Sequence, residues 1–325
     1  MMKKKRIDWI DYEKGFILMF VCLAHCGVYS PINGFHMAAF FFISGLLFND
    51  KYNSIKDYIL RKVHTLLIPY LGLSFLFLFL YRKLYANFFH NFLLYGNDII
   101  QGYSSPNVSP LWFVYSLFQV TCVFFIFFHF NKHKIKSKSW ILLLACLCFG
   151  LGWMLNKHIL PFKVSTFITS LAFYSLGVYF KDFFIDHISH VSKRLLYLFL
   201  VLAFFLWAIG QKMVNGVIGY NNNNLGDTFI GYFLVSVFGI FICTLLFYFC
   251  RKIKQNILFF LLKYIANNGI VVLALHMFVI NECDHLFYNL TELAWYPYFE
   301  ACIMITIVAI GIPLFTKYLP WLIGK

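Results

Sequence analysis

Apolar residues occupy this chain in long stretches that short polar segments separate. Most of these stretches come close to the ~20 residues that a helix needs to cross the hydrocarbon core of a bilayer. The pattern predicts an all-α fold, a polytopic membrane helix bundle of about ten transmembrane helices, with residues 1–325 as a single integral-membrane domain. The ten stretches are residues 10–30, 35–49, 65–81, 111–129, 139–155, 164–180, 195–213, 227–250, 265–281 and 298–319.

Two segments between these stretches are unusually polar. Residues 84–101 mix apolar side chains with Asn87, His90 and Asp98, and we predict that they lie along the outer membrane interface. Asn221–Asn224 form a polar run in an outer loop, which we interpret as a linker and not as a site.

The composition supports a membrane protein. The chain is 61% hydrophobic, contains 42 phenylalanines, and is only 12% charged, against roughly 25% charged residues in soluble domains. A soluble fold could not bury so much apolar surface. The nine cysteines lie almost wholly inside apolar stretches and none is spaced with histidines as metal ligands are, so we expect neither a disulfide nor a metal site.

A net charge of +14 would suit a nucleic-acid partner, but the placement of the cations excludes it. With the N-terminus in the cytoplasm, most of the 27 Lys and Arg residues fall in inner segments. This positive-inside bias predicts a multi-pass protein with both termini cytoplasmic, whose basic loops contact anionic membrane lipids. The outer segments hold Arg82, Lys83, Lys157, Lys163 and Lys212.

Lys14 and His25 are predicted to face the same side of the first helix. Eleven residues of α-helix end about 20° past three full turns and ~16 Å further along the axis. Ionisable residues at membrane depth mark functional sites by default. His25 would lie in the outer half of the membrane, as a base at the end of a channel or as a partner in a hydrogen bond between helices.

A stripe of side chains on this helix is predicted to face the bundle interior, because its members recur at steps of three and four residues. Asp11 begins the stripe at the cytoplasmic end and could hold Lys14 by an i, i+3 contact. The stripe comprises Asp11, Lys14, Gly15, Leu18, Cys22 and His25.

The remaining candidates each have a structural alternative. His36 opens the second stretch at the outer surface, and Ser44 with Gly45 would permit close helix packing. Trp112 suits an interfacial anchor, and His276 lies within the ninth stretch. A further group, Arg61, Lys62 and His64, suits either inner-loop topology or a clamp for phosphate groups.

These residues stand in the order of known motifs, and the chain resembles the acyltransferase-3 family of bacterial membrane acyltransferases, which O-acylate polysaccharides and other surface glycans. The resemblance covers the whole chain, and ten spans is the architecture of that family. The similar segments are Trp9–Gly15 followed by His25, Phe35–Gly45, Arg61 followed by Pro69-Tyr70, Leu111–Phe113, and Gly269 followed by His276.

The resemblance implies roles for these residues. His25 corresponds to the essential base, and Lys14 to the Arg or Lys that precedes it. Arg61 is kept, whereas Thr65 stands where related sequences often have a second Arg, so Lys62 or His64 would take its place. We assign catalysis to His25 and His36, donor binding to Lys14, Arg61, Lys62 and His64, and substrate binding to Asp11, Ser44, Trp112 and His276.

The resulting hypothesis is an O-acetyltransferase of the bacterial inner membrane. It would move an acetyl or other short acyl group from cytoplasmic acetyl-CoA to a hydroxyl of a cell-surface glycan, such as O-antigen or exopolysaccharide, or of its lipid-linked precursor. No esterase-like domain follows the apolar stretches, so the chain would complete the transfer itself, as a monomer or homo-oligomer, or hand the acyl group to a separate transferase.

Two other functions fit the same pattern. A glycan or lipid transporter or flippase would use the polar stripe without acyl transfer, and an accessory subunit of polysaccharide synthesis would keep His25 for structure alone. The sequence leaves open the acceptor, the choice between acetyl and succinyl groups, and whether an acyl-enzyme forms.

Overall fold

The fold is entirely helical across the part of the chain that the structure describes, as predicted. The structure is a computed structural model, and it describes residues 7–28, 34–52, 54–80, 88–103, 109–131, 138–214, 218–253 and 256–324. An isolated bridge between Gly219 and Asn224 is the β-type pairing found within these ranges.

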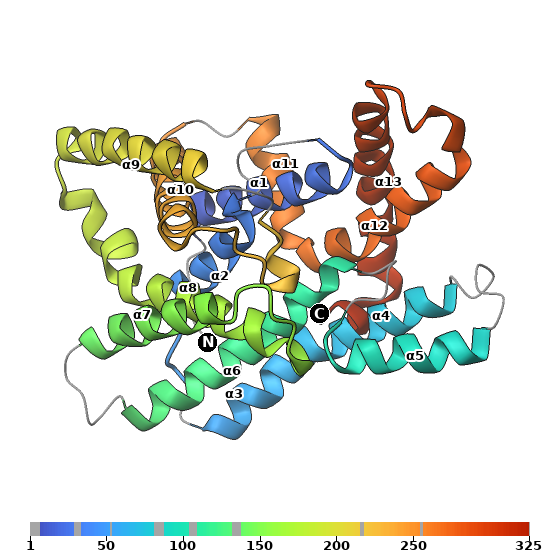
Figure 1. Cartoon of the computed structure of the whole chain (residues 1–325), viewed down its shortest axis with the longest axis horizontal. Coiled ribbons are helices and arrows are strands. Elements are labelled where there is room, and N and C mark those ends of the chain that lie inside the picture. Colours follow the sequence, from blue (N-terminus) through green and yellow to red (C-terminus); the bar gives the residue numbers. More distant parts are fainter. Residues whose placement is uncertain are drawn as a thin grey trace.

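Thirteen α-helices follow one another along these ranges (Figure 1). α3 continues through a π-helical turn, Val63–Leu67, directly into α4. The helices are α1 Asp8–His25, α2 His36–Leu46, α3 Ile55–Lys62, α4 Ile68–Leu80, α5 Phe88–Ile100, α6 Trp112–Asn131, α7 Ser139–Met154, α8 Val164–Asp182, α9 Lys193–Met213, α10 Phe229–Cys250, α11 Ile257–Asn267, α12 Gly269–Leu286 and α13 Tyr296–Tyr318.

Each of the ten predicted stretches contains a helix, but the count of about ten transmembrane helices is not confirmed. Six helices of the described residues are long and apolar enough to cross a membrane, namely Ile55–Leu80, α6, α9, α10, α12 and α13. α2, α7 and α11 are apolar but shorter. The 11 residues of α2 extend only ~16 Å, about half of the hydrocarbon thickness.

The structure also corrects one boundary. The predicted stretch 265–281 is interrupted, because α11 ends at Asn267 and α12 begins at Gly269. α11 was not expected as a separate helix, and it packs against α1. A Cβ atom on Gly15 of α1 would lie 1.9 Å from the carbonyl oxygen of Leu262 in α11, so the two backbones approach closely at that glycine.

Three helices begin at a side chain that accepts a hydrogen bond from the first turn. Ser54 accepts from the amide of Asp57 at α3, Ser192 from Leu195 at α9, and Asn256 from Phe259 at α11. Such N-caps satisfy backbone donors that have no partner within the helix. They explain why these helices start at the polar end of an apolar run.

The short helix α2 lies in the middle of the molecule, in contact with α1, α8 and α10 (Figure 1). Its contact with α8 depends on two glycines. A Cβ on Gly45 would lie 2.1 Å from the carbonyl oxygen of Tyr174, and a Cβ on Gly177 would lie 2.0 Å from that of Phe42. Small residues allow membrane helices to pack this closely, which agrees with the packing interpretation of the Ser44–Gly45 pair.

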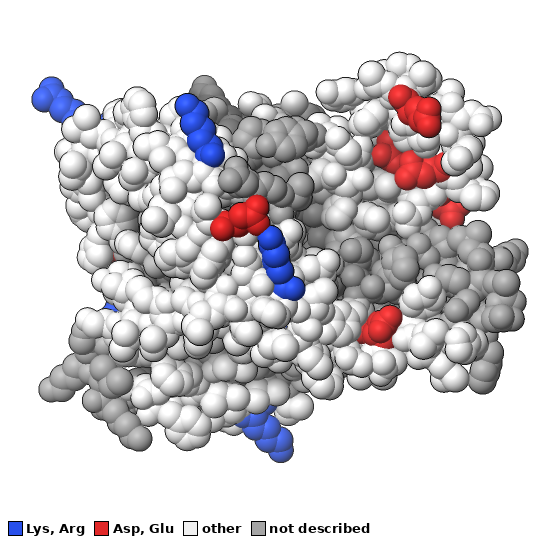
Figure 2. Space-filling model, viewed as in Figure 1, with Lys and Arg blue, Asp and Glu red and all other residues white. Residues whose placement is uncertain are grey.

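Many large apolar side chains are exposed on the surface of the helix bundle. On the face shown in Figure 2, charged side chains are few and wide uncharged areas separate them. α9 lies at the edge of the bundle (Figure 1). Only 17% of its most apolar 18-residue stretch is buried. Its exposed Leu198 and Phe205 suit contact with lipid chains, which agrees with a multi-pass membrane protein.

We predict that Gly177→Ala lowers the stability of the folded protein by about 1–3 kcal/mol, because the added methyl group would collide with the backbone of α2. The midpoint of thermal unfolding in detergent measures the effect. Gly150→Ala in α7 is the matched control, because its Cβ would meet nothing within 4 Å. It should leave the midpoint unchanged or raise it. Equal midpoints for the two variants would contradict the tight contact between α2 and α8.

Candidate active site

One face of α1 lines three cavities that follow each other along the helix. Lys14 lies on the first and second cavities, Leu18 on the second, and Val21 and His25 on the third. The volumes of the cavities are about 310, 240 and 340 Å³. Lys14 and His25 therefore lie on one continuous face, as the spacing predicts, although three members of the predicted stripe, Asp11, Gly15 and Cys22, do not line the cavities. Gly15 packs against α11, and Cys22 is buried.

The first cavity gathers most of the predicted donor-binding cations. Lys14 of α1, Arg61 and Lys62 of α3 and Ser44 of α2 line it. A tyrosine ring lies beside each of the two cations of α3. The Arg61 guanidinium lies 5.7 Å from the ring centre of Tyr52, and the Lys62 ammonium lies 5.3 Å from that of Tyr58.

The other predicted residues of this end are placed differently. Ser44 donates its hydroxyl proton to the carbonyl oxygen of Phe40 at 2.8 Å, so its exchangeable proton is already used within α2. His64 is exposed on the π-helical turn and is not among the residues that line the first cavity. Asp11 is buried one turn before Lys14 and does not line the three cavities either.

The second cavity lies between the first and the third and shares wall residues with each. Lys14, Leu66 and Leu117 belong to both the first and the second cavity, and Leu273 of α12 belongs to both the second and the third. The break between α11 and α12 contributes Asn267, Asn268 and Gly269 to its wall, the remainder of which is mostly apolar. The shared residues make the three cavities neighbours, with α1 as their common wall.

The third cavity brings together residues that are distant in the sequence. His25 ends α1, His36 begins α2 and Trp112 begins α6, and all three line this cavity. Pro110 precedes Trp112 on the wall, and Met37 follows His36. The structure thus brings together three candidate residues that the sequence analysis treats separately.

His276 lies behind His25 and not on the wall of this cavity. The two rings are 5.3 Å apart between centres, and His276 is fully buried. Its Nδ1 lies 2.8 Å from the carbonyl oxygen of Val272. A carbonyl only accepts, so Nδ1 carries the proton and Nε2 of the neutral ring holds a lone pair. His276 therefore packs against His25 behind the cavity wall, and its Nε2 has no hydrogen-bond partner among the described residues.

Sequence reasoning missed three residues of this end, namely Tyr220, Asn221 and Lys163. Tyr220 and Asn221 line the third cavity, although the asparagine run was interpreted as a linker. Lys163, counted only as an outer cation, is 3% exposed and donates to Asn221. Burial lowers the pKa of Lys163 to about 8. A loop that folds back onto distant helices leaves no periodic signal in the sequence, so these residues could not be found from spacing.

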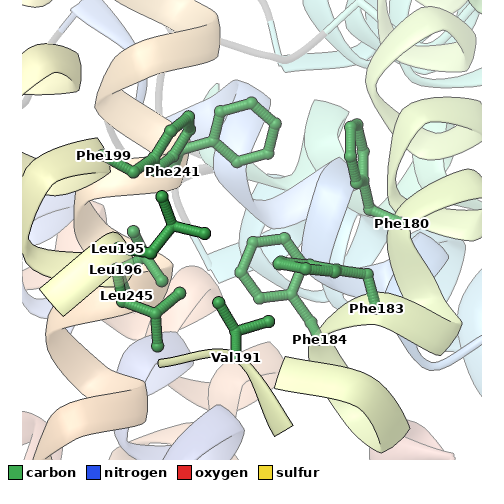
Figure 3. A pocket seen from close by; sticks show the side chains of 9 residues that line it. All are labelled: Phe180, Phe183, Phe184, Val191, Leu195, Leu196, Phe199, Phe241 and Leu245. Carbon is green, nitrogen blue, oxygen red and sulfur yellow. The ribbon is translucent and has the colours of Figure 1, made fainter. Parts of the chain in front are cut away.

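A larger cavity of about 420 Å³ lies elsewhere, between the end of α8 and the helices α9 and α10. Figure 3 shows that the side chains around it carry no nitrogen, oxygen or sulfur. It therefore has no group that could exchange a proton or bind a charge, whereas the third cavity has the two imidazoles of His25 and His36. Among the described residues, no three His, Cys, Asp or Glu side chains are grouped as metal ligands.

The chain matches a known protein family. A protein-family model described as an acyltransferase domain matches residues 7–316, nearly the whole chain. No curated protein and no solved structure matches the chain.

We predict that the first and third cavities open to opposite sides of the membrane. A membrane-impermeant maleimide should label Ala24→Cys, on the third cavity, from the outer side and Ser44→Cys, on the first cavity, from the cytoplasmic side. Mass spectrometry of the labelled peptides separates these positions from the native cysteines. Ala172→Cys, which replaces a buried residue of α8, should stay unlabelled from both sides. Labelling of Ala24→Cys and Ser44→Cys from the same side would refute the proposed arrangement.

Proposed function

The chain belongs to the acyltransferase-3 family, and from this premise we propose that it is an O-acetyltransferase of the bacterial inner membrane. It would transfer an acetyl or other short acyl group from cytoplasmic acyl-CoA to a hydroxyl of a cell-surface glycan or its lipid-linked precursor. One observation carries the proposal. The three adjoining cavities along α1 lead from the cations Lys14, Arg61 and Lys62 to the imidazole of His25.

The first cavity suits the nucleotide end of acetyl-CoA. Three cations at one cavity would neutralise the phosphate groups, and Arg61 offers a planar fork that fits a phosphate. Tyr52 and Tyr58 add aromatic surface beside these cations. The positive-inside bias supports a cytoplasmic position for this end, where acyl-CoA would be found.

The second cavity suits the pantetheine arm, which is long, thin and only moderately polar. Lys14 and His25 lie ~16 Å apart along α1, a distance comparable to the extended reach of the arm. With the phosphates near Lys14, the thioester would therefore arrive beside His25. The amide groups of Asn267 and Asn268 offer partners for the polar atoms of the arm.

His25 is the proposed general base. It takes the proton from an acceptor hydroxyl while the hydroxyl oxygen attacks the thioester carbon. The tetrahedral intermediate then collapses, the bond from carbon to sulfur breaks, and the CoA thiolate receives a proton from the imidazolium of His25. The products are an O-acyl ester and CoA thiol, so protons and electrons balance. His36 lies in the same cavity and is the second candidate for moving this proton.

A glycan transporter or flippase remains the alternative, since an interior path of polar groups suits transport as well. The two functions differ in one product. Transport would move the glycan and leave acetyl-CoA intact, whereas the transferase releases CoA thiol.

We predict that His25→Ala lowers the rate of acetyl transfer by about 10²- to 10⁴-fold, the contribution typical of a positioned general base. The assay combines purified protein, radiolabelled acetyl-CoA and membranes of the native cell, whose glycans include the acceptor, and counts labelled glycan and released CoA thiol. His285→Ala, an exposed histidine of α12, is the matched control and should keep full activity. Full transfer by the His25→Ala variant would refute the mechanism.

We predict further that Arg61→Ala and Lys14→Ala raise the KM for acetyl-CoA more than the KM for the glycan. Both side chains line the first cavity, where the phosphates would bind. His64→Ala tests the specificity of the effect, because His64 lies on the adjoining turn without lining this cavity. If His64→Ala weakened acetyl-CoA binding as much as Arg61→Ala, the effect would reflect a general disturbance of this end and not a contact of Arg61 with the phosphates.

A further inference from the structure

The asparagine run between α9 and α10 is built into the bundle. Asn223 is fully buried, and its Oδ1 accepts a hydrogen bond from the hydroxyl of Thr169 in α8 at 2.7 Å. Its amide nitrogen donates to the carbonyl oxygens of Gly152 and Leu155, at the end of α7, at 3.1 and 2.7 Å. Because both halves of this amide are satisfied inside the protein, Asn223 fixes the loop against α7 and α8.

Asn221, two residues earlier, is held from one side only. The ammonium of Lys163 donates to the Oδ1 of Asn221 at 2.7 Å and to its backbone carbonyl at 3.0 Å. The hydroxyl of Thr166 donates to the same carbonyl at 3.1 Å. An ammonium has no acceptor, so chemistry alone assigns the oxygen of the amide to the side of Lys163. The amide nitrogen of Asn221, with its two donors, then lies on the other branch.

Asn221 also belongs to the wall of the third cavity. Asn221 lines this cavity together with His25, His36 and Trp112. Tyr220 precedes it on the wall and lies nearly parallel to Trp112, with ring centres 6.1 Å apart and planes at 23°. Within the described ranges, the hydrogen bonds of the Asn221 side chain are those from Lys163, and no acceptor is found for its amide nitrogen.

We propose that Asn221 is an acceptor-binding residue, whose amide donates a hydrogen bond to an oxygen of the glycan and holds the reacting hydroxyl beside His25. Lys163 is the positioning residue that fixes the orientation of this amide. The proposal rests on the proposed acyl transfer and names the contact that selects a sugar over water. A pyranose offers several hydroxyl and ring oxygens to such a donor, and the neighbouring aromatic rings suit its apolar face.

An amide donor could instead stabilise the oxyanion that forms on the thioester. The placement of the loop favours the acceptor. Tyr220 and Asn221 line the third cavity but neither of the two cavities through which the donor would enter. The competing roles predict different kinetics, because an oxyanion forms whether a sugar or water attacks, whereas a sugar contact matters only when the sugar is bound.

The test measures how acyl groups are divided between the glycan and water. Full-length protein in membranes of the native cell receives radiolabelled acetyl-CoA, and labelled glycan and free labelled acetate are counted separately. Asn221→Asp keeps an oxygen for Lys163 and removes both N–H donors in the same volume. We expect the ratio of transfer to hydrolysis to fall roughly ten-fold, the weight of one lost hydrogen bond, through a higher KM for the glycan with an unchanged KM for acetyl-CoA.

The adjacent residue provides the matched control. Asn222 is exposed and is absent from the wall of the cavity, so Asn222→Asp should keep the wild-type ratio. Lys163→Met should shift the ratio in the same direction as Asn221→Asp, because the amide loses its fixed orientation.

Three outcomes would overturn the proposal. They are an unchanged ratio in Asn221→Asp, an equal fall in transfer and hydrolysis, and the same shift in Asn222→Asp. Failure of the acyltransferase function itself would look different, because the wild-type protein would then produce neither labelled glycan nor labelled acetate.

Discussion

An apolar helix bundle can hold ionisable side chains only where they meet a polar or charged partner or a cavity. This constraint acts most strongly on α1, which carries Glu13, Lys14 and His25 through the bundle. Glu13 is fully buried and accepts a hydrogen bond from Thr244 of α10 at 2.7 Å. Lys14 and His25 instead line cavities. The face of α1 that carries Lys14 and His25 therefore lines the three adjoining cavities.

The elements around α1 contribute to these cavities in different ways. α2 is too short to cross a bilayer. Its first residue, His36, lies at the third cavity. Gly45 lets α2 pack closely against α8. The break between α11 and α12 puts polar groups beside the second cavity. The loop before α10 contributes Tyr220 and Asn221 to the wall of the third cavity and is anchored by Asn223. In each of these places a helix ends or is interrupted beside a cavity, and a polar side chain lies there.

Much of this could be predicted from the sequence, because helical periodicity and apolar length are local properties. The all-α fold and the shared face of Lys14 and His25 agree with the structure, whereas the grouping of His25 with His36 and Trp112 emerges only from the tertiary fold. Depth and contact between distant segments are not local. Gly15 follows the same period as Lys14 yet packs against α11, and His276 lies behind His25 because of how α12 crosses α1. The sequence identifies Lys163 only as one of the few outer cations. The tertiary fold reveals that it is buried against Asn221.

The central claim is that donor and acceptor reach one histidine from opposite sides of the membrane. Sealed right-side-out membrane vesicles of the native cell, loaded inside with radiolabelled acetyl-CoA, test it most directly. We expect labelled O-acetyl groups on glycans of the outer surface while acetyl-CoA stays inside, and loss of this label in vesicles that carry His25→Ala. Label confined to glycans of the inner surface, or outer label that persists without His25, would contradict it.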